Sequence, residues 1–405
     1  MHSSPLNTTQ KTAIVIGAGI SGCATAYSLA KRDWQVTVIE RFSHIAQAAS
    51  GNARGVLYPR LASHNSVQDR LSLSSYAYTL KLLQALKLNE ADFQAYGVLQ
   101  LAFNARESAR IHDIAQRHLA HDIVRLVSAA EASAIAGVKV TYPALYFAQA
   151  GWLNPPAFCH ALMQHPNIQL VTNTDALSLQ QQADRWQVHA NTGLVAAASS
   201  VVIANANDAL NFDQTRHFPM TPVRGQMTTV NATPTSTSLK TVLCTDGYIT
   251  PAFAGQHCLG ATFAANNNDI SAQEADNQTN LAMLPTMSAD LTTLAQQAAT
   301  GRAALRCATP DYMPLVGALL DATALKHQPP KHRTSADKLT WHHGIYVNVG
   351  HGAKGLITAP LCAEILASAI TGEPSPVDAS LVSALQPNRF LLRDLGLKRL
   401  VTDFV

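Results

Sequence analysis

Cysteine is scarce in this chain of 405 residues, and its six cysteines lie far apart. They form no C-x-x-C pair and no spacing with histidine that is typical of a zinc site. The adjacent His342 and His343 have no companion ligands in the sequence, so we expect no metal. Scattered thiols without a disulfide framework indicate a reducing compartment, and we therefore expect a cytoplasmic location.

Strong charge of one sign and an unbroken apolar run are also missing. The net charge of +3 neither indicates nor excludes a nucleic-acid binder. Apolar residues make up 47% of the chain and charged residues 14%, which is typical of a globular protein, and the length favours two domains. Glycines interrupt the apolar stretch 13–30, and charged residues 31–33 follow it, so we expect a soluble protein with a flexible N-terminus at 1–10. No internal repeats occur.

The first motif present is a strand–helix–strand unit, "KTAIVIGAGISGCATAYSLAKRDWQVTVIE". The short apolar run at 13–16 predicts a buried strand, and residues 22–32 have the composition of a helix. Alternation at 35–39 predicts a second strand. Together they predict a βαβ unit of the kind that binds a dinucleotide.

Three glycines and one acid in this unit are the expected contacts to the pyrophosphate and the ribose of the dinucleotide. Gly17, Gly19 and Gly22 form G-x-G-x-x-G, which gives a tight turn, close backbone approach to a pyrophosphate and close packing of helix on strand. Glu40 ends the second strand, where a carboxylate accepts the ribose hydroxyls and disfavours the 2′-phosphate of NADP. NAD and FAD both fit this motif.

The loop "AASGNARGVLYPRL" at 48–61 distinguishes the two cofactors. It resembles the segment of D-amino-acid-oxidase-like flavoproteins that runs beside the flavin ring and the pyrophosphate. Small residues there let main-chain N–H groups reach a ligand, although a surface turn with an incidental arginine has similar composition. The resemblance implies FAD contacts at Ala49, Ser50, Gly51, Asn52, Arg54, Gly55 and Val56.

Four later segments extend the resemblance over nearly the whole chain. They are "AGWLNPPAFCHAL" (150–162), "SVVIANAND" (200–208, where Ala206 replaces the usual glycine), "GRAALRCATPDYMPLVG" (301–317) and "YVNVGHGAKGLITAPLCAEILASAITGEP" (346–374). The remaining residues that the resemblance places at FAD are Gly17, Ala18, Gly19, Ile20, Ser21, Gly22, Glu40, Arg41, Ala204, Asn205, Gly350, His351, Gly352, Ala353, Lys354, Gly355 and Leu356.

Within this family the chain is similar to the FAD-dependent half of bacterial bifunctional enzymes that make 5-methylaminomethyl-2-thiouridine at the tRNA wobble position. The similar segments include "LCTDGYITP", "RCATPDYMPLVG" and "DASLVSALQPNR". The resemblance implies oxidative removal of a carboxymethyl group as glyoxylate, by hydride transfer to the flavin and hydrolysis of the imine. About ten residues precede the first strand, so the methyl-transfer activity of those enzymes is not carried over. The chain is either a stand-alone oxidoreductase or a fragment of a bifunctional enzyme, and a methyltransferase domain or protein is a candidate partner.

Two side chains are assigned by this resemblance to the substrate carboxylate. Arg306 offers bidentate guanidinium geometry, and Tyr248 offers a hydroxyl donor. The alternatives are an ordinary ion pair for Arg306 and a half-buried sheet aromatic for Tyr248. Lys354 is a third candidate, as a cation near the flavin or as a surface lysine.

Three further residues keep two interpretations each. Arg224 either fixes a glutamate or the flavin at the cleft or belongs to the structural scaffold. His351 resembles the family's G-H-G histidine, and a hydrogen-bonded structural role is favoured over a catalytic base. Cys307 is either an inert buried thiol or a point of covalent flavin attachment.

Two basic segments are candidates for contact with tRNA phosphates. They are "KHQPPKHR" at 326–333 and "NRFLLRDLGLKR" at 388–399. Solvated faces of a loop and a helix are the alternative.

The expected fold class is α/β: a Rossmann-type FAD-binding domain, glutathione-reductase- and D-amino-acid-oxidase-like, with a discontinuous α+β substrate domain carrying a mostly antiparallel sheet. We assign 11–85, 143–215 and 302–405 to the FAD domain, and 86–142 and 216–301 to the substrate domain. Expected antiparallel strands lie at 221–230, 240–251 and 257–264. Two other functions stay open: an oxidase or dehydrogenase of a free amino acid (glycine, sarcosine or a D-amino acid), and a non-catalytic flavin- or NAD-binding protein, in which Arg306 and Tyr248 would not converge.

Overall fold

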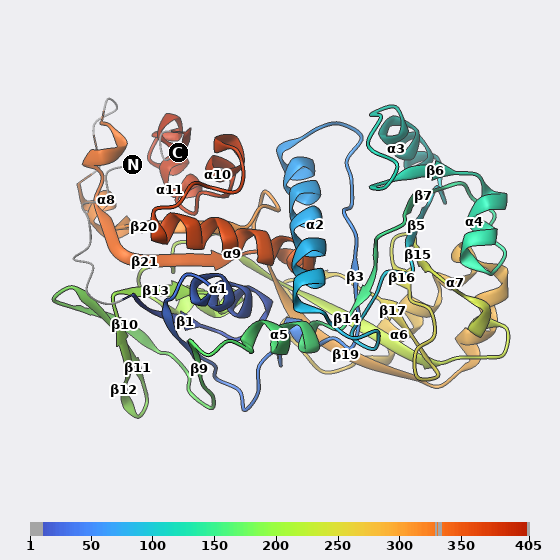
Figure 1. The fold of residues 1–405 in the computed structure, drawn as a ribbon, viewed down its shortest axis with the longest axis horizontal. Helices are drawn as coiled ribbons and strands as arrows, with labels where there is room; N and C mark the ends of the chain where they lie inside the picture. Colours follow the sequence, from blue (N-terminus) through green and yellow to red (C-terminus); the bar gives the residue numbers. More distant parts are fainter. Residues whose placement is uncertain (1–10, 329, 331–333, 403–405) are drawn as a thin grey trace.

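The computed structural model describes residues 11–328, 330 and 334–402. The predicted flexible N-terminus at 1–10 and part of the basic segment 326–333 lie outside the described residues. Two large sheets dominate the rest, one in each half of the molecule (Figure 1).

A six-stranded sheet forms the first half, with β1 (Thr12–Ile16) near its centre. Parallel partners flank β1 on both sides, and one antiparallel strand closes the edge. Its order is β20 (Leu315–Leu320), β21 (Trp341–Val349), β13 (Ser200–Ile203), β1, β2 (Gln35–Ile39) and β9 (Ile168–Val171). The apolar run after Thr12 is buried because helices cover the sheet, as expected for parallel strands.

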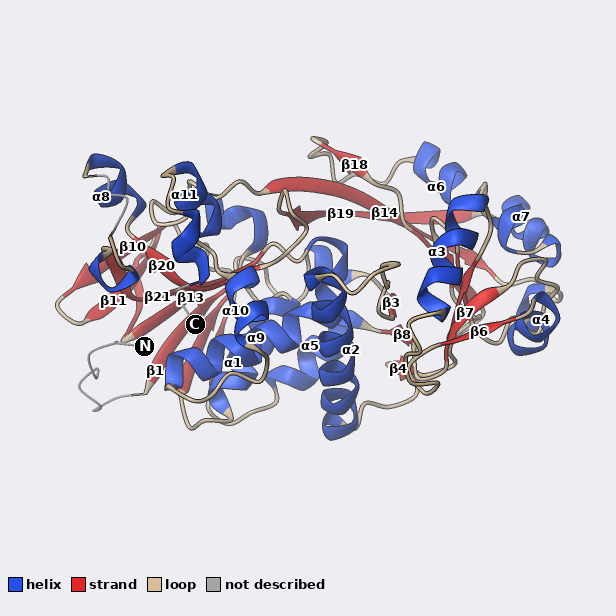
Figure 2. Ribbon diagram, turned by 90° about the horizontal axis from the view of Figure 1, so that it is seen from above, coloured by secondary structure: helices blue, strands red, loops and turns tan. Residues whose placement is uncertain are grey.

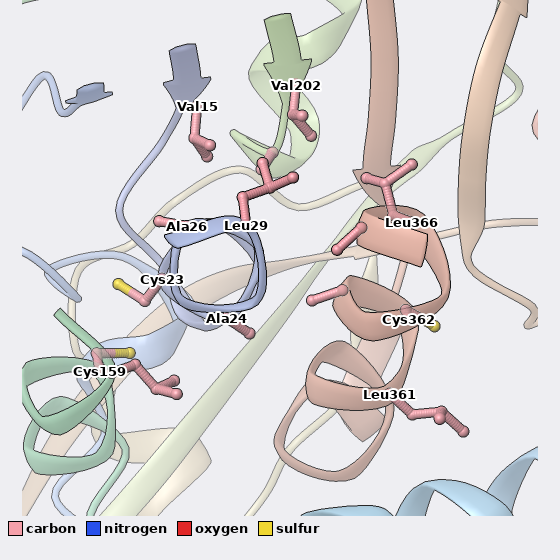
Figure 3. Close-up of a cluster of buried hydrophobic side chains, with 14 of the residues drawn as sticks. Val15, Cys23, Ala24, Ala26, Leu29, Cys159, Val202, Leu361, Cys362 and Leu366 are labelled. Atoms are coloured by element: carbon pink, nitrogen blue, oxygen red, sulfur yellow. The ribbon is translucent and has the colours of Figure 1, made fainter. Parts of the chain in front are cut away.

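Helix α1 (Ile20–Ala30) packs against this sheet and against α9 (Gly355–Thr371). Figure 3 shows Leu29 of α1 pointing toward the sheet, with small side chains such as Ala24 on the turns beside α9. Helices α5 (Pro155–Met163) and α2 (Val67–Leu86) complete the layer. By length and composition the helical stretch Gly352–Thr371, which contains α9, could cross a membrane, but most of it is buried in this core.

A nine-stranded, mostly antiparallel sheet forms the second half. Its two longest strands, β14 (Thr221–Asn231) and β19 (Ala299–Ala308), pair over ten consecutive residues without a bulge and run side by side in Figure 2. The other strands are β18 (Ala264–Ala265), β17 (Gln256–Gly260), β16 (Tyr248–Ile249), β15 (Val242–Cys244), β5 (Val98–Leu101), β7 (Ala144–Phe147) and β6 (Arg125–Val127). Helices α3 (Ala105–Ala115), α4 (Ala129–Ala136), α6 (Glu274–Leu281) and α7 (Leu284–Met287) lie in this half (Figure 1).

Smaller elements surround the two sheets. A three-stranded antiparallel sheet contains β10 (Ser178–Gln182), β11 (Arg185–Ala190) and β12 (Gly193–Ala198). Another contains β3 (Gly55–Leu57), β8 (Gly151–Leu153) and β4 (Phe93–Gln94). Short helices α8 (Ala322–His327), α10 (Ala379–Leu385) and α11 (Arg389–Asp394) lie toward the C-terminal end of the chain.

The expected fold class is confirmed, with three differences in detail. The strand expected at 257–264 is two strands, β17 and β18, because the strand pairing with β14 is interrupted at residues 261–263 between them. The strand expected at 240–251 is two strands, β15 and β16, because a turn in which Thr245 N–H donates to Gly247 O (2.8 Å) separates them. Strand β7 and most of β19 pair within the nine-stranded sheet, although the predicted boundaries at 143 and 302 assign them to the FAD domain. The domain division itself stays a prediction.

Candidate cofactor and substrate site

A cavity of about 470 Å³ is lined by residues from both large sheets. On one side it is lined at the carboxyl ends of β1, β2, β13 and β21, by residues such as Gly17, Glu40, Asn205 and Gly350. Its other wall includes Tyr248 and residues of β19. The carboxyl ends of parallel strands are where α/β sheets bind their ligands.

The glycine turn brings backbone to the cavity wall. Gly17 has φ +98°, and a Cβ there would lie 2.8 Å from the Cα of Asn205. Gly19 also lines the cavity, at the start of α1. Gly22 lies behind it, where a Cβ would come within 1.8 Å of Gly17 O, so its role is the close packing of helix and strand.

Glu40 is buried beside this turn and lines the cavity. Its carboxylate accepts hydrogen bonds from the N–H groups of Ala18 (2.7 Å) and Phe42 (3.0 Å). These bonds fix the side chain, and a carboxylate retains further lone pairs for ribose hydroxyls. Ala18 therefore orients Glu40 instead of lining the cavity, whereas Arg41 lines it and pairs with Asp208 (2.9 Å).

The loop at 48–56 is fixed by contacts at both of its faces. Ser50 Oγ accepts the N–H of Ile20 (2.9 Å), a free donor of the first turn of α1. On the other face Arg302 of β19 donates to Asn52 Oδ1 (2.8 Å) and to the carbonyls of Gln47 and Ala48 where the loop begins. A Cβ at Gly51 would lie 2.3 Å from this guanidinium, so glycine is required for the contact.

Arg54 does not line the cavity. Its guanidinium donates to the carbonyls of Gln256 (3.0 Å) and Phe253 (2.9 Å) and lies over the ring of Trp152. The side chain therefore ties the loop to the second sheet. Its neighbours Gly55 and Val56 do line the cavity, as do Ala49, Ser50 and Asn52.

The glycine loop after β21 is held by a polar network. Ser21 Oγ donates to Asn348 O (2.5 Å), and the His351 ring lies within hydrogen-bond distance of Asn348 Oδ1 (3.1 Å) and Thr358 Oγ1 (2.9 Å). Burial lowers the pKa of His351 to about 4. The imidazole is therefore neutral at physiological pH and supports the structural interpretation. Residues Gly350, His351, Gly352, Ala353, Gly355 and Leu356 line the cavity.

Two features at the end of β13 match a cofactor that carries hydrogen-bond donors, such as the ribityl and ribose hydroxyls or the flavin N–H of FAD. Asn205 Oδ1 is buried in the cavity wall without a hydrogen-bond partner among the described residues, and a buried polar atom of this kind calls for one. Ala204 and Ala206 line the cavity beside it. Ala206 adopts φ +54°, the left-handed conformation that the glycine usual at this position adopts without strain. The cradle of glycines, Glu40 and free main-chain donors therefore fits FAD.

Arg306 and Tyr248 meet at the opposite wall. Both line the cavity, and the charge of Arg306 opposes the rise in the pKa of Tyr248 that burial causes. Burial lowers the pKa of Arg306, yet a guanidinium stays charged at neutral pH. Its Nη1 donates to Thr262 O (3.2 Å), and a Cβ on Gly225 would lie within 2.2 Å of the guanidinium. A charged group with donors to spare next to a buried hydroxyl is suited to binding a carboxylate.

Two other candidates, Arg224 and Lys354, lie outside the cavity wall, and a third, Cys307, lines it as a protonated thiol. Arg224 is buried on the face of β14 opposite to Arg306, where it pairs with Asp276 and donates to the carbonyl of Ser271 (2.8 Å), so its role is scaffold. Lys354 is absent from the cavity wall, and burial and Arg60 lower its pKa. Cys307 does line the wall, but burial raises the pKa of its thiol to about 12, which makes it a poor nucleophile.

The basic segment 388–399, a candidate for contact with tRNA phosphates, is not fully exposed in the structure. Arg389 is buried, pairs with Asp311 (2.8 Å) and donates to main-chain carbonyls, so it cannot contact phosphate. Arg399 donates to Thr334 O. The segment 388–399 therefore serves partly as packing.

Sequence reasoning missed several residues of the site. Arg60 and Phe263 line the cavity, and Arg302 and Gly225 shape it from β19 and β14. Arg60 lies within the quoted loop 48–61, so its position in "LYPRL" was a usable signal. Nothing in the local sequence marks Phe263, because its role arises from the pairing of distant strands.

Comparison with known proteins decides between the dinucleotide cofactors, since residues 12–369 match the family described as FAD dependent oxidoreductase, DAO. The chain belongs to this family. FAD is therefore its cofactor, and the protein is an FAD-dependent oxidoreductase.

The curated relatives narrow the resemblance. The chain is 47% identical over 391 residues to the tRNA 5-methylaminomethyl-2-thiouridine biosynthesis bifunctional protein MnmC of Methylobacillus flagellatus, covering 96% of this chain and 60% of that protein. It is 44% identical to the Chromobacterium violaceum protein of the same name, covering 97% and 61%. This chain thus spans about three fifths of the curated relatives that it matches.

Solved structures share the fold at low identity. Glycine oxidase from Geobacillus kaustophilus aligns with a TM-score of 0.76 at 20% identity, covering 93% of this chain and 98% of that one. Iminodiacetate oxidase from Chelativorans sp. BNC1 aligns with a TM-score of 0.72 at 21% identity, covering 90% and 97%. These likenesses confirm the architecture.

Proposed function

We propose that this chain oxidatively removes the carboxymethyl group from 5-carboxymethylaminomethyl-(2-thio)uridine at the tRNA wobble position. The products are the 5-aminomethyl nucleoside and glyoxylate. The observation that carries the proposal is the joint position of Arg306 and Tyr248 in the wall of the FAD cavity. The similarity to proteins named for tRNA 5-methylaminomethyl-2-thiouridine biosynthesis is the reason for proposing this nucleoside as the substrate.

The residues of the chain account for binding and orientation. Arg306 and Tyr248 hold the carboxylate, which fixes the adjacent methylene group in the cavity. FAD, held by the glycine turn and Glu40, would supply the two-electron acceptor for a hydride from this methylene carbon. Water then adds to the resulting C=N bond of the substrate, and cleavage of the C–N bond leaves the aldehyde on glyoxylate and the amine on the nucleoside.

The environment of the site keeps its groups in the required charge states. Burial raises the pKa of Tyr248, so its hydroxyl remains a donor at neutral pH. No further acid or base is required if the substrate amine binds unprotonated. Lys354 and Cys307 therefore have no part in the proposed reaction.

The rim of the cavity supports a large substrate. The Arg60 side chain lines the cavity and is half exposed, with Glu107 as an ion-pair partner at 3.9 Å. A basic group at an open rim suits the phosphates that flank a wobble nucleotide. A methyltransferase domain or protein would act on the product, and the reaction belongs in the cytoplasm.

The experiment uses purified protein and tRNA from cells arrested at the carboxymethylaminomethyl stage. We expect nucleoside mass spectrometry to show loss of the carboxymethyl group, with glyoxylate released in equal amount. Unchanged tRNA together with rapid oxidation of glycine, sarcosine or a D-amino acid would instead establish the free-amino-acid function. A protein that retains FAD but oxidises neither substrate would point to the non-catalytic alternative.

A further inference from the structure

Phe263 is unusual among the large apolar residues of the chain because it is exposed and lines the cavity. Its exposed fraction is 62%, whereas most phenylalanines of the described chain are buried or partly buried. Ile270 and Tyr312 are exposed to a similar degree, but neither contributes to the cavity wall. An apolar ring left in water at the rim of a binding site indicates a ligand that covers it.

The exposure of Phe263 does not result from a loose loop. Thr262 N–H donates to Gln226 O (3.2 Å), and Gln226 N–H donates to Thr262 Oγ1 (3.0 Å). Directly after Phe263, β18 pairs with β14, with Ala264 opposite Arg224. The backbone is therefore fixed on both sides, and the ring is held at the rim in advance of binding.

The ring also has a fixed relation to the carboxylate-binding group. The guanidinium carbon of Arg306 lies 5.3 Å from the centroid of the Phe263 ring. In the proposed substrate four bonds separate the carboxylate carbon from the pyrimidine ring, which is roughly 5 Å when extended. A carboxylate held at Arg306 thus brings the base into the neighbourhood of Phe263.

We propose that Phe263 is the stacking platform for the pyrimidine ring of the target uridine. The inference rests on the proposed function and names the residue that recognises the base portion of the substrate. Proteins that bind unpaired nucleotides stack bases on exposed aromatic rings, and an aromatic face accepts a uracil or a 2-thiouracil equally. Arg306 then selects the carboxylate, and Phe263 selects for a planar base attached to it.

The test compares variants at Phe263 with a matched variant at Tyr312, an exposed aromatic outside the cavity. Phe263→Ala is expected to lower kcat/KM for tRNA carrying the 5-carboxymethylaminomethyl group by about 5- to 150-fold, mainly through a higher KM. Phe263→Trp is expected to restore the efficiency and Phe263→Leu is not, because leucine is apolar but has no aromatic face. Tyr312→Ala is expected to behave as the wild type, and FAD content and Tm serve as folding controls for every variant.

A second readout does not depend on turnover. The tryptophan fluorescence of Phe263→Trp should be quenched by the same tRNA, beyond any change in the wild type. Full efficiency of Phe263→Leu would overturn the stacking role, and so would an unchanged KM in Phe263→Ala. The reaction of the wild-type protein with tRNA tests the proposed function by itself. If the wild type does not act on the tRNA, the proposed function fails; if the wild type acts and the Phe263 variants match it, only the stacking role fails.

Discussion

The two walls of the cavity are built by different means. The FAD wall consists mainly of main chain: glycines at tight approaches, free N–H groups at the start of α1, and one acid fixed by backbone donors. The substrate wall consists of side chains such as Arg306, Tyr248 and Phe263, which distant strands bring together. A wall made of main chain constrains local sequence strongly, whereas a wall made of side chains depends on strand pairing.

The FAD wall is most sensitive at Gly17. In Gly17→Ala the new Cβ meets the backbone of Ala204 and Asn205 at 2.8–2.9 Å, and φ is +98°. We expect loss of bound FAD and destabilisation by roughly 3–5 kcal/mol, from strain and clash combined. FAD absorbance after gel filtration and urea unfolding measure the two effects.

Gly193→Ala is the matched control, since Gly193 has φ +100° but no atom within 4 Å of the added Cβ. This substitution should lower the free energy of unfolding by about 1 kcal/mol, and the variant should retain FAD. Equal effects of the two variants would show that conformation alone, and not the close approach, makes Gly17 necessary.

The substrate wall is most sensitive at Arg306. Arg306→Ala is expected to lower kcat/KM by about 100-fold or more while FAD stays bound, because it removes a partly buried charged donor from the substrate carboxylate. Steady-state kinetics and FAD absorbance on the same sample measure both quantities. Arg216→Ala, which removes a surface arginine paired with Asp213, is the control and should be unaffected. A normal kcat/KM in Arg306→Ala would remove the carboxylate assignment.

His351 makes the FAD wall sensitive to acid. Its pKa is about 4 in the folded protein and about 6.5 when unfolded, so the unfolded state binds more protons between these values. The stability that it contributes is complete above pH 6.5 and is lost as pH falls toward 4, by up to about 3 kcal/mol. Urea unfolding at pH 7 and pH 4.5 measures the loss, and His351→Gln should reduce it. An unchanged pH dependence in that variant would assign the acid sensitivity to other groups.

Arg302 and Arg306 lie on one face of β19 but serve different walls. Arg302→Ala should weaken FAD binding roughly tenfold, because the loop carbonyls lose a charged donor, while KM for the substrate changes little at saturating FAD. Titration of apoprotein with FAD provides the measurement. A variant with normal FAD affinity and raised KM would place Arg302 with Arg306 on the substrate side.

The contrast between the walls explains what the sequence could predict. The roles of Gly17 and Glu40 can be predicted from their spacing within one strand–helix–strand unit, so the cofactor-binding fold could be predicted from the sequence. The sequence left Arg224 open between function and scaffold, because Arg224 and Arg306 lie on opposite faces of paired strands and the sequence does not say which face borders the cavity. Arg54 lies in the flavin loop and turns away from it to reach Gln256, which only the tertiary fold determines. Phe263 and Arg302 were missed for the same reason.

The unbroken pairing of β19 with β14 also limits how this protein can vary in evolution. Four residues of strand, roughly 13 Å, separate Arg302 at the cofactor loop from Arg306 at the substrate, and alternation keeps both on one face. Gain or loss of one residue between them would turn one arginine to the other face of the sheet. Relatives that keep this site should therefore tolerate substitutions in 303–305 and exclude insertions and deletions there.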